Sequence, residues 1–140
     1  MIIRAWLWLS IIVCGLALRG FGSGLGLPAF FVKYGGSLLW GTMVFFSAAM
    51  VARGQSRPRI ALISISIAVC VELFRLVHAP WLDAFRLTTA GALLLGRIFS
   101  PWNMLAYGVG IIFGMLLDRL GMAAFAKARS PARGLMGGPL

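Results

Sequence analysis

The sequence predicts an all-α integral membrane protein with four transmembrane helices and one additional helix at the external membrane surface. Hydrophobic side chains make up 61% of the 140 residues, and charged side chains only 11%. A soluble domain carries about 25% charged residues, and a chain of this size cannot bury such an excess of apolar groups by itself. The composition therefore excludes a soluble globular domain, a disordered chain and a disulfide-stabilised secreted module.

The first predicted span is the apolar run Ala5–Leu18, which lies between Arg4 and Arg19. It is shorter than the about 20 residues that cross a bilayer, but residues 1–3 extend it and arginine side chains can reach the head groups. No small-x-small cleavage pattern follows the run, so we interpret it as an uncleaved anchor rather than a signal peptide. The glycine-rich stretch 20–28 is expected to be a flexible loop.

Three further apolar runs predict the other spans, at about Gly35–Ala52, Ile60–His78 and Asn103–Leu117. With the first run they form one membrane domain, residues 1–119. Residues 120–140 follow as a basic tail, which is expected to be cytoplasmic and flexible.

The segment 81–99 is ambiguous, because it carries charged residues within an apolar stretch between Pro80 and Pro101. Cytoplasmic loops are enriched in Lys and Arg. With four spans, both termini share one side with the basic link 53–59, whereas a fifth crossing would separate that link from the basic tail. We therefore expect a multi-pass protein of the bacterial inner membrane with both termini cytoplasmic. The segment 81–99 is then a re-entrant or interfacial helix on the outside.

Glu72 lies deep in the third run, where a lone charge costs at least about 2.5 kcal/mol. Arg75 is three residues further along and shares its helix face, and His78 overlaps the edge of that face. Two interpretations stay open: a structural ion pair near the external end of the helix, or a polar pocket that opens to the outside. Glu72 and His78 are also the candidate acid and base of an enzyme, because carboxylates and imidazoles are the usual groups for this role.

Other polar side chains favour the pocket interpretation. Arg86 follows Asp83 by three residues after Pro80, and Asn103 and Tyr107 share one face of the last run. Guanidinium groups bind phosphate through paired donors, so the sequence predicts a site for a phosphate-bearing head group. The predicted ligand-binding residues are Glu72, Arg75, His78, Trp81, Arg86, Asn103 and Tyr107.

Gly110 and Gly114 form a GxxxG pattern in the last run. Glycines at this spacing let a second helix backbone approach closely. The pattern predicts helix packing, either within the bundle or between two copies of the chain.

An ordered set of residues across positions 35–118 resembles a small bacterial integral-membrane family, domain of unknown function 2809. The set comprises Glu72, Arg75, Ala79-Pro80-Trp81, Arg86, Leu95-Gly96, Phe99, Trp102-Asn103, Ala106-Tyr107, Gly110 and Gly114. The chain is also distantly similar to VanZ-like proteins, which are four-helix membrane proteins of the cell envelope. Arg75 stands where the family has Gln, and Asn103 where it has Asp. Asn103 cannot act as a general base, so chemistry that needs that carboxylate would be lost in this chain.

The leading functional prediction is a protein that binds a lipid or an envelope-precursor head group in an outward-facing pocket. The alternatives are an accessory subunit of a larger membrane complex or a transporter, and a membrane enzyme acting on a lipid head group. No cofactor and no metal are expected, because Cys14 and Cys70 lie in different runs without other ligands at metal-binding spacing. Membrane lipids are the expected partners and nucleic acid is not; a homodimer or a larger membrane complex stays open.

Overall fold

The structure is a computed structural model that describes residues 1–95 and 99–134. Within this range the chain forms helices and no strands. The helices are α1 (Ile2–Phe21), α2 (Ala29–Val51), α3 (Arg57–Phe74), α4 (Pro80–Leu87), α5 (Thr89–Leu94) and α6 (Pro101–Gly134).

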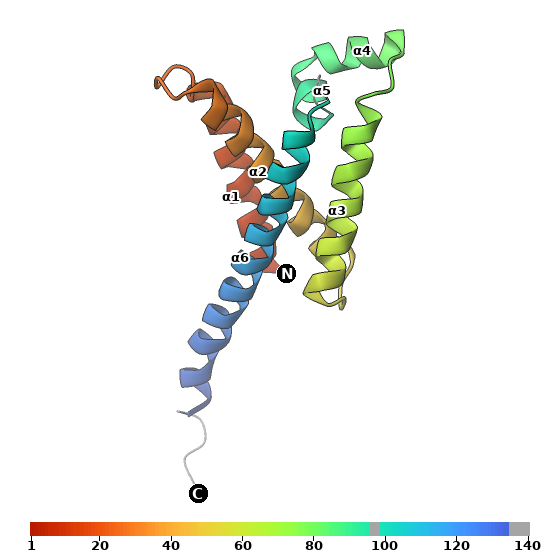
Figure 1. The fold of residues 1–140 in the computed structure, drawn as a ribbon. Coiled ribbons are helices and arrows are strands. Elements are labelled where there is room, and N and C mark those ends of the chain that lie inside the picture. The colour runs from red at the N-terminus through yellow and green to blue at the C-terminus, as the bar shows by residue number, and fades with distance from the viewer. Residues whose placement is uncertain (96–98, 135–140) are drawn as a thin grey trace, which may run out of the picture.

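The long helices α1, α2, α3 and α6 form the bundle, and α2 and α6 are its central pair. Helix α1 packs on α2, while α3 packs against both α2 and α6 from the other side (Figure 1). The turn 22–28 and the short helices α4 and α5 lie at one end, which we name the loop end. The N-terminus and the link 52–56 lie toward the other end, which we name the terminal end (Figure 1).

Helices α1, α2 and residues Pro101–Ala128 of α6 are long and apolar enough to cross a membrane. Their outward surfaces are apolar as well: in α1 the only buried side chain is Ile11, and large hydrophobic residues such as Trp6 and Val13 are exposed. Such a surface is stable in lipid and unstable in water. The chain is therefore a multi-pass membrane protein.

Helix α3 lies where the third span is predicted, but it is not among the described helices that are long and apolar enough to cross a membrane. It has 18 residues, about 27 Å in length at 1.5 Å per residue. It carries Arg57 and Arg59 in its first turn and Glu72 in its last. It ends at Phe74 rather than reaching His78, because the chain then turns and Ala79 adopts the extended conformation that a following proline favours.

Two other predicted boundaries also differ. Helix α2 begins at Ala29, directly after Pro28, instead of near Gly35. Helix α6 continues past Leu117 to Gly134, so much of the stretch predicted as a flexible tail is helical. At about 50 Å it exceeds the roughly 30 Å hydrocarbon core, and Figure 1 shows it projecting beyond the other helices. Residues 135–140 of the predicted tail lie outside the described residues.

The ambiguous segment 81–99 is not one helix. It contains α4 with 8 residues and α5 with 6, so neither is long enough to span the membrane. The break falls at Thr88, whose side-chain oxygen accepts a hydrogen bond from the Gly91 backbone N–H and caps α5. Residues 96–98 of the segment lie outside the described residues.

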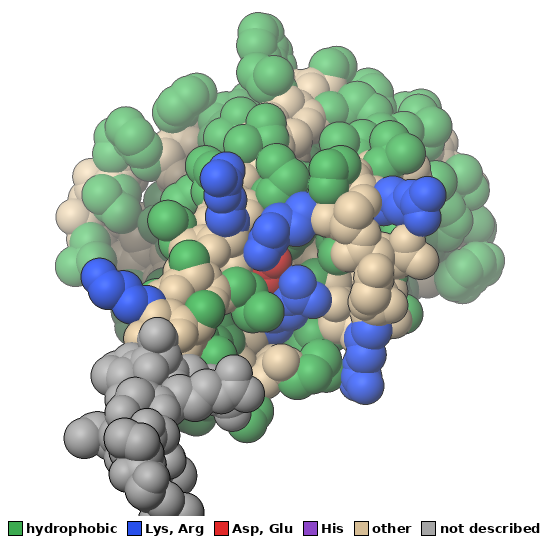
Figure 2. Space-filling model, turned by 90° about the horizontal axis from the view of Figure 1, so that it is seen from below, with side chains coloured by type: hydrophobic (Ala, Val, Ile, Leu, Met, Phe, Trp, Pro, Cys, Tyr) green, Lys and Arg blue, Asp and Glu red, His purple; other side chains and the backbone are tan. Residues whose placement is uncertain are grey.

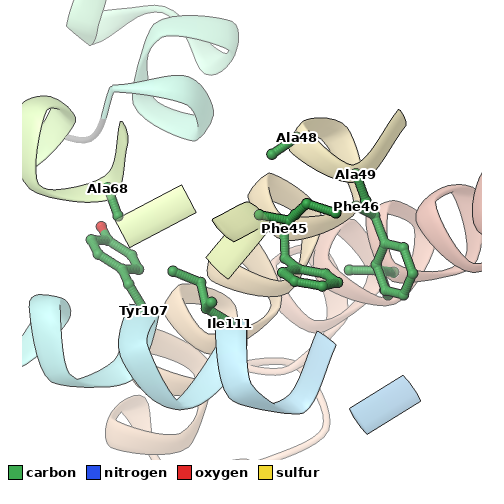
Figure 3. Close-up of a cluster of buried hydrophobic side chains, with 9 residues drawn as sticks. Phe45, Phe46, Ala48, Ala49, Ala68, Tyr107 and Ile111 are labelled. Atoms are coloured by element: carbon green, nitrogen blue, oxygen red, sulfur yellow. The ribbon is translucent and has the colours of Figure 1, made fainter. Parts of the chain in front are cut away.

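Helices α2 and α6 cross in close contact, and the hydrophobic core lies beside this crossing. A Cβ added to Gly110 would lie 2.0 Å from the Leu38 carbonyl oxygen, and one added to Gly41 would lie 2.6 Å from that of Tyr107. The buried Thr42 hydroxyl donates a hydrogen bond to the Gly110 carbonyl at 2.8 Å. The face with Gly110 and Gly114 is thus in contact with α2 of the same chain. The aromatic residues Phe45 and Phe46 extend this contact into the hydrophobic core (Figure 3).

Replacing Gly110 by Ala is expected to destabilise the bundle by about 1 to 3 kcal/mol, the usual cost of overpacking. The added methyl group would meet backbone atoms of α2, so the helices must separate. Gly108→Ala is the matched control, because a Cβ there meets nothing within 4 Å and gives the same gain in helix propensity. Unfolding by SDS in mixed micelles measures both variants, and equal stabilities would contradict the close crossing.

Candidate functional site

The charged pair predicted from the sequence lies at the loop end, between the end of α3 and the start of α6. Glu72 is fully buried, and Arg75 Nη1 lies 2.6 Å from its Oε2. Glu72 Oε1 also accepts a hydrogen bond from the Ser100 backbone N–H at 2.7 Å, directly before α6. A carboxylate at a helix N-terminus is electrostatically favourable. Glu72 therefore links α3 to the beginning of α6.

The Arg75 guanidinium connects three segments of the chain. Its Nη2 donates a hydrogen bond to the Tyr107 hydroxyl at 2.8 Å, and its Nε donates to the Leu95 carbonyl that follows α5. The Tyr107 ring packs on Trp40 of α2, with 4.7 Å between the ring centroids. Glu72, Arg75 and Tyr107 thus form one buried cluster.

Asn103 lies one turn before Tyr107 on α6 and is buried. Its Oδ1 accepts a hydrogen bond from the Ser37 hydroxyl of α2 at 3.3 Å. We name the group Glu72, Arg75, Asn103 and Tyr107 the loop-end cluster.

The other predicted site residues form a separate group around α4. Arg86 is buried and donates hydrogen bonds to the carbonyl oxygens of Val77 at 2.8 Å and Phe74 at 2.6 Å. The Phe74 carbonyl also accepts a hydrogen bond from the Val77 backbone N–H at 3.1 Å, so Arg86 reinforces the turn that follows α3. Its Nη1 also donates to Asp83 Oδ1 at 3.1 Å. Arg86 therefore contacts Asp83 and the backbone after α3, whereas Arg75 contacts Glu72, Leu95 and Tyr107.

His78 and Trp81 lie on the surface of this second group. The His78 side chain is 71% exposed, and its Nδ1 lies 3.4 Å from Asp83 Oδ1. Trp81 is also largely exposed. Glu72 and His78, the candidate acid and base, thus have different partners: Glu72 contacts Arg75, and His78 contacts Asp83. Among the described residues, no group of three His, Cys, Asp or Glu side chains lies close enough to hold a metal ion.

A pocket of about 480 Å³ lies between α1, α2 and α5, and Arg75 and Tyr107 form part of its wall. This volume is typical of small-ligand sites. The cation Arg19 and the hydroxyl of Ser37 lie toward its loop end, while apolar residues line the deeper part along α1 and α2. Two of the seven predicted ligand-binding residues, Arg75 and Tyr107, line the pocket.

A second charged cluster, which was not predicted from the sequence, lies toward the terminal end. Asp118 of α6 is 1% exposed, with Arg4 Nε at 2.6 Å from Oδ1 and Arg57 Nε at 2.9 Å from Oδ2. Arg4 also donates to the Ala49 carbonyl at 3.1 Å, so α1, α2, α3 and α6 all meet here. Figure 2, a view from this end, shows Lys and Arg side chains around acidic surface. We name Arg4, Arg57 and Asp118 the terminal-end cluster.

One signal for this cluster was present in the sequence. Asp118 follows Gly114 by four residues, and Gly114 follows Gly110 by four, so all three share the face that packs against the bundle. An acid on a buried face needs a cation.

Comparison with known families supports the resemblance noted in the sequence. A family model described as a protein of unknown function (DUF2809) matches residues 26–111. The chain belongs to this family. The DUF2809 match includes the whole loop-end cluster, whereas Arg4 and Asp118 of the terminal-end cluster lie outside it. No solved structure matches this DUF2809 protein. Its distant VanZ-like resemblance stays a prediction.

Proposed function

We propose that this protein is a four-span protein of the bacterial inner membrane, with both termini cytoplasmic, and that it binds an anionic lipid from the outer leaflet. The distribution of cations supports the orientation: the terminal end carries most of them, among them Arg53, Arg59 and Arg119. Helix α3 is about 27 Å long, close to the thickness of the hydrocarbon core, so its length supports a fourth span. Its buried Glu72 has a counter-charge in Arg75, which lowers the cost of placing this helix in lipid. The short helices α4 and α5 then lie on the outside.

The polarity gradient of the pocket carries the proposal. Arg19, Ser37 and Arg75 lie toward the loop end, where head groups would be, and apolar residues such as Ile12 and Met43 lie deeper. A lipid has the same gradient, with a charged head and an apolar chain. The order of polar and apolar groups along the membrane normal is therefore the same in the pocket lining and in a lipid.

Arg75 has capacity left for a ligand. A guanidinium has five N–H groups; Arg75 donates hydrogen bonds from Nε and Nη2 and pairs with Glu72 through Nη1. Its own charge is balanced by Glu72, so the exposed Arg19 supplies the unbalanced positive charge that attracts an anion. We assign Arg75 the role of a hydrogen-bond donor and Arg19 that of the electrostatic anchor.

Replacing Arg19 by Gln is expected to weaken phosphatidylglycerol binding about tenfold, because one charge-assisted hydrogen bond contributes about 1.5 kcal/mol. Arg119→Gln is the matched control, since it removes one exposed cation at a site away from the pocket. Native mass spectrometry of the detergent-purified protein, titrated with phosphatidylglycerol and with phosphatidylcholine, measures both. Absence of bound phosphatidylglycerol, or equal affinity of both variants, would overturn the proposal.

A further inference from the structure

The lining of the pocket follows α1 and α2 over matching lengths. On α1 it runs from Trp8 to Arg19, and on α2 from Gly36 to Ser47. Each stretch advances eleven residues, about 16 Å along a helix. The turn 22–28 makes α1 and α2 an antiparallel hairpin, so both stretches cover the same depth (Figure 1). The pocket is therefore a slot parallel to these helices.

The deep end of the slot is closed by a pair of hydrogen-bonded side chains. Trp8 Nε1 donates to the Ser47 hydroxyl at 2.9 Å, and Ser47 in turn donates to the Met43 carbonyl at 2.9 Å. These bonds fix the Trp8 indole to α2 at this end of the slot. Trp8 and Ser47 are also the deepest pocket residues on their two helices.

The mouth of the slot is wide where the helices carry small residues. A Cβ added to Gly36 would meet nothing within 4 Å, and the alanines Ala90 and Ala92 of α5 form the facing wall. A larger side chain at position 36 can therefore fit without displacing the backbone and would occupy the slot.

We infer that the slot holds one acyl chain about one leaflet deep, and that the Trp8–Ser47 pair limits the length of that chain. This inference rests on the proposed function and names its ligand class, an acyl phospholipid. The hydrocarbon core is about 30 Å thick, so one leaflet is close to the 16 Å between mouth and floor. A polyprenyl carrier is much longer than the slot and would leave most of its chain outside it.

The test is a chain-length series of saturated lysophosphatidylglycerols, supplied in equal amounts to the purified protein and measured by native mass spectrometry. The protein is expected to retain most of the lipid whose extended acyl chain is about 16 Å long, the length of the slot. The retained amount of this lipid should be at least fivefold that of the lipid with the shortest chain. Gly36→Leu should abolish retention at every length, and Gly108→Leu, at an equally open position away from the pocket, should not.

Trp8→Ala should shift the peak to longer chains, because it removes the floor. Trp6→Ala is the matched control: it lies two residues away on the same helix and is 66% exposed. Retention without any length preference, or stronger retention of undecaprenyl phosphate, would overturn the chain-length inference while leaving lipid binding in place. Failure to retain any of these lipids would overturn both.

Discussion

Asp118→Asn should lower the free energy of unfolding by about 3 kcal/mol. Breaking a buried ion pair leaves an uncompensated charge, which typically costs 3 to 5 kcal/mol. Here two cations, Arg4 and Arg57, lose their common partner. The lower value applies because the Arg57 side chain is 40% exposed and can turn toward water. SDS unfolding in mixed micelles, followed by circular dichroism, is the measurement.

The control is Arg119→Gln at the next residue of α6, which removes an exposed cation. A surface charge of this kind contributes at most about 1 kcal/mol. If Arg119→Gln and Asp118→Asn destabilise the protein equally, the terminal-end cluster does not hold the bundle together.

Glu72→Gln should have an effect of similar or larger size, about 3 to 5 kcal/mol. The change leaves Arg75, which is only 8% exposed, without its counter-charge inside the bundle. The hydrogen bond from Ser100 can persist, because a glutamine oxygen also accepts. The expected loss is therefore electrostatic, and SDS unfolding again measures it.

A double-mutant cycle separates the lone charge from other effects. The double variant Glu72→Gln/Arg75→Gln has no unpaired charge, so it should be more stable than the sum of the two single changes implies. An additive result would show that Glu72 and Arg75 do not stabilise one another.

The positions of the long helices could be predicted from their apolar runs, although among the described helices only α1, α2 and α6 are long and apolar enough to cross a membrane. The ends of these helices could not. Helix α3 ends at Phe74 because the backbone turns there, and Arg86, twelve residues later, donates a hydrogen bond to the Phe74 carbonyl. That contact depends on the path of residues 75–80, and hydrophobic periodicity does not encode such a path.

The contacts of the candidate site likewise differ in how far the sequence predicts them. Glu72 and Arg75 are three residues apart on one helix, so their pairing follows from helical geometry. Arg4 and Asp118 are 114 residues apart, and no local spacing relates them. Arg86 could be placed near Asp83 by spacing, but its distance from Arg75 depended on tertiary structure. Spacing gave the local pairs; the grouping of Tyr107 with Arg75 was also expected, whereas the contact between Arg4 and Asp118 was not.

The pairing of Arg4 with Asp118 also has a consequence for biosynthesis. Asp118 is synthesised 114 residues after Arg4. At translation rates of about 5 to 20 residues per second, Asp118 is synthesised about 6 to 23 seconds after Arg4. A chain that stops before residue 118 can insert its early helices but cannot close this contact. The membrane's proteolytic quality control would therefore encounter truncated chains as open, less stable bundles.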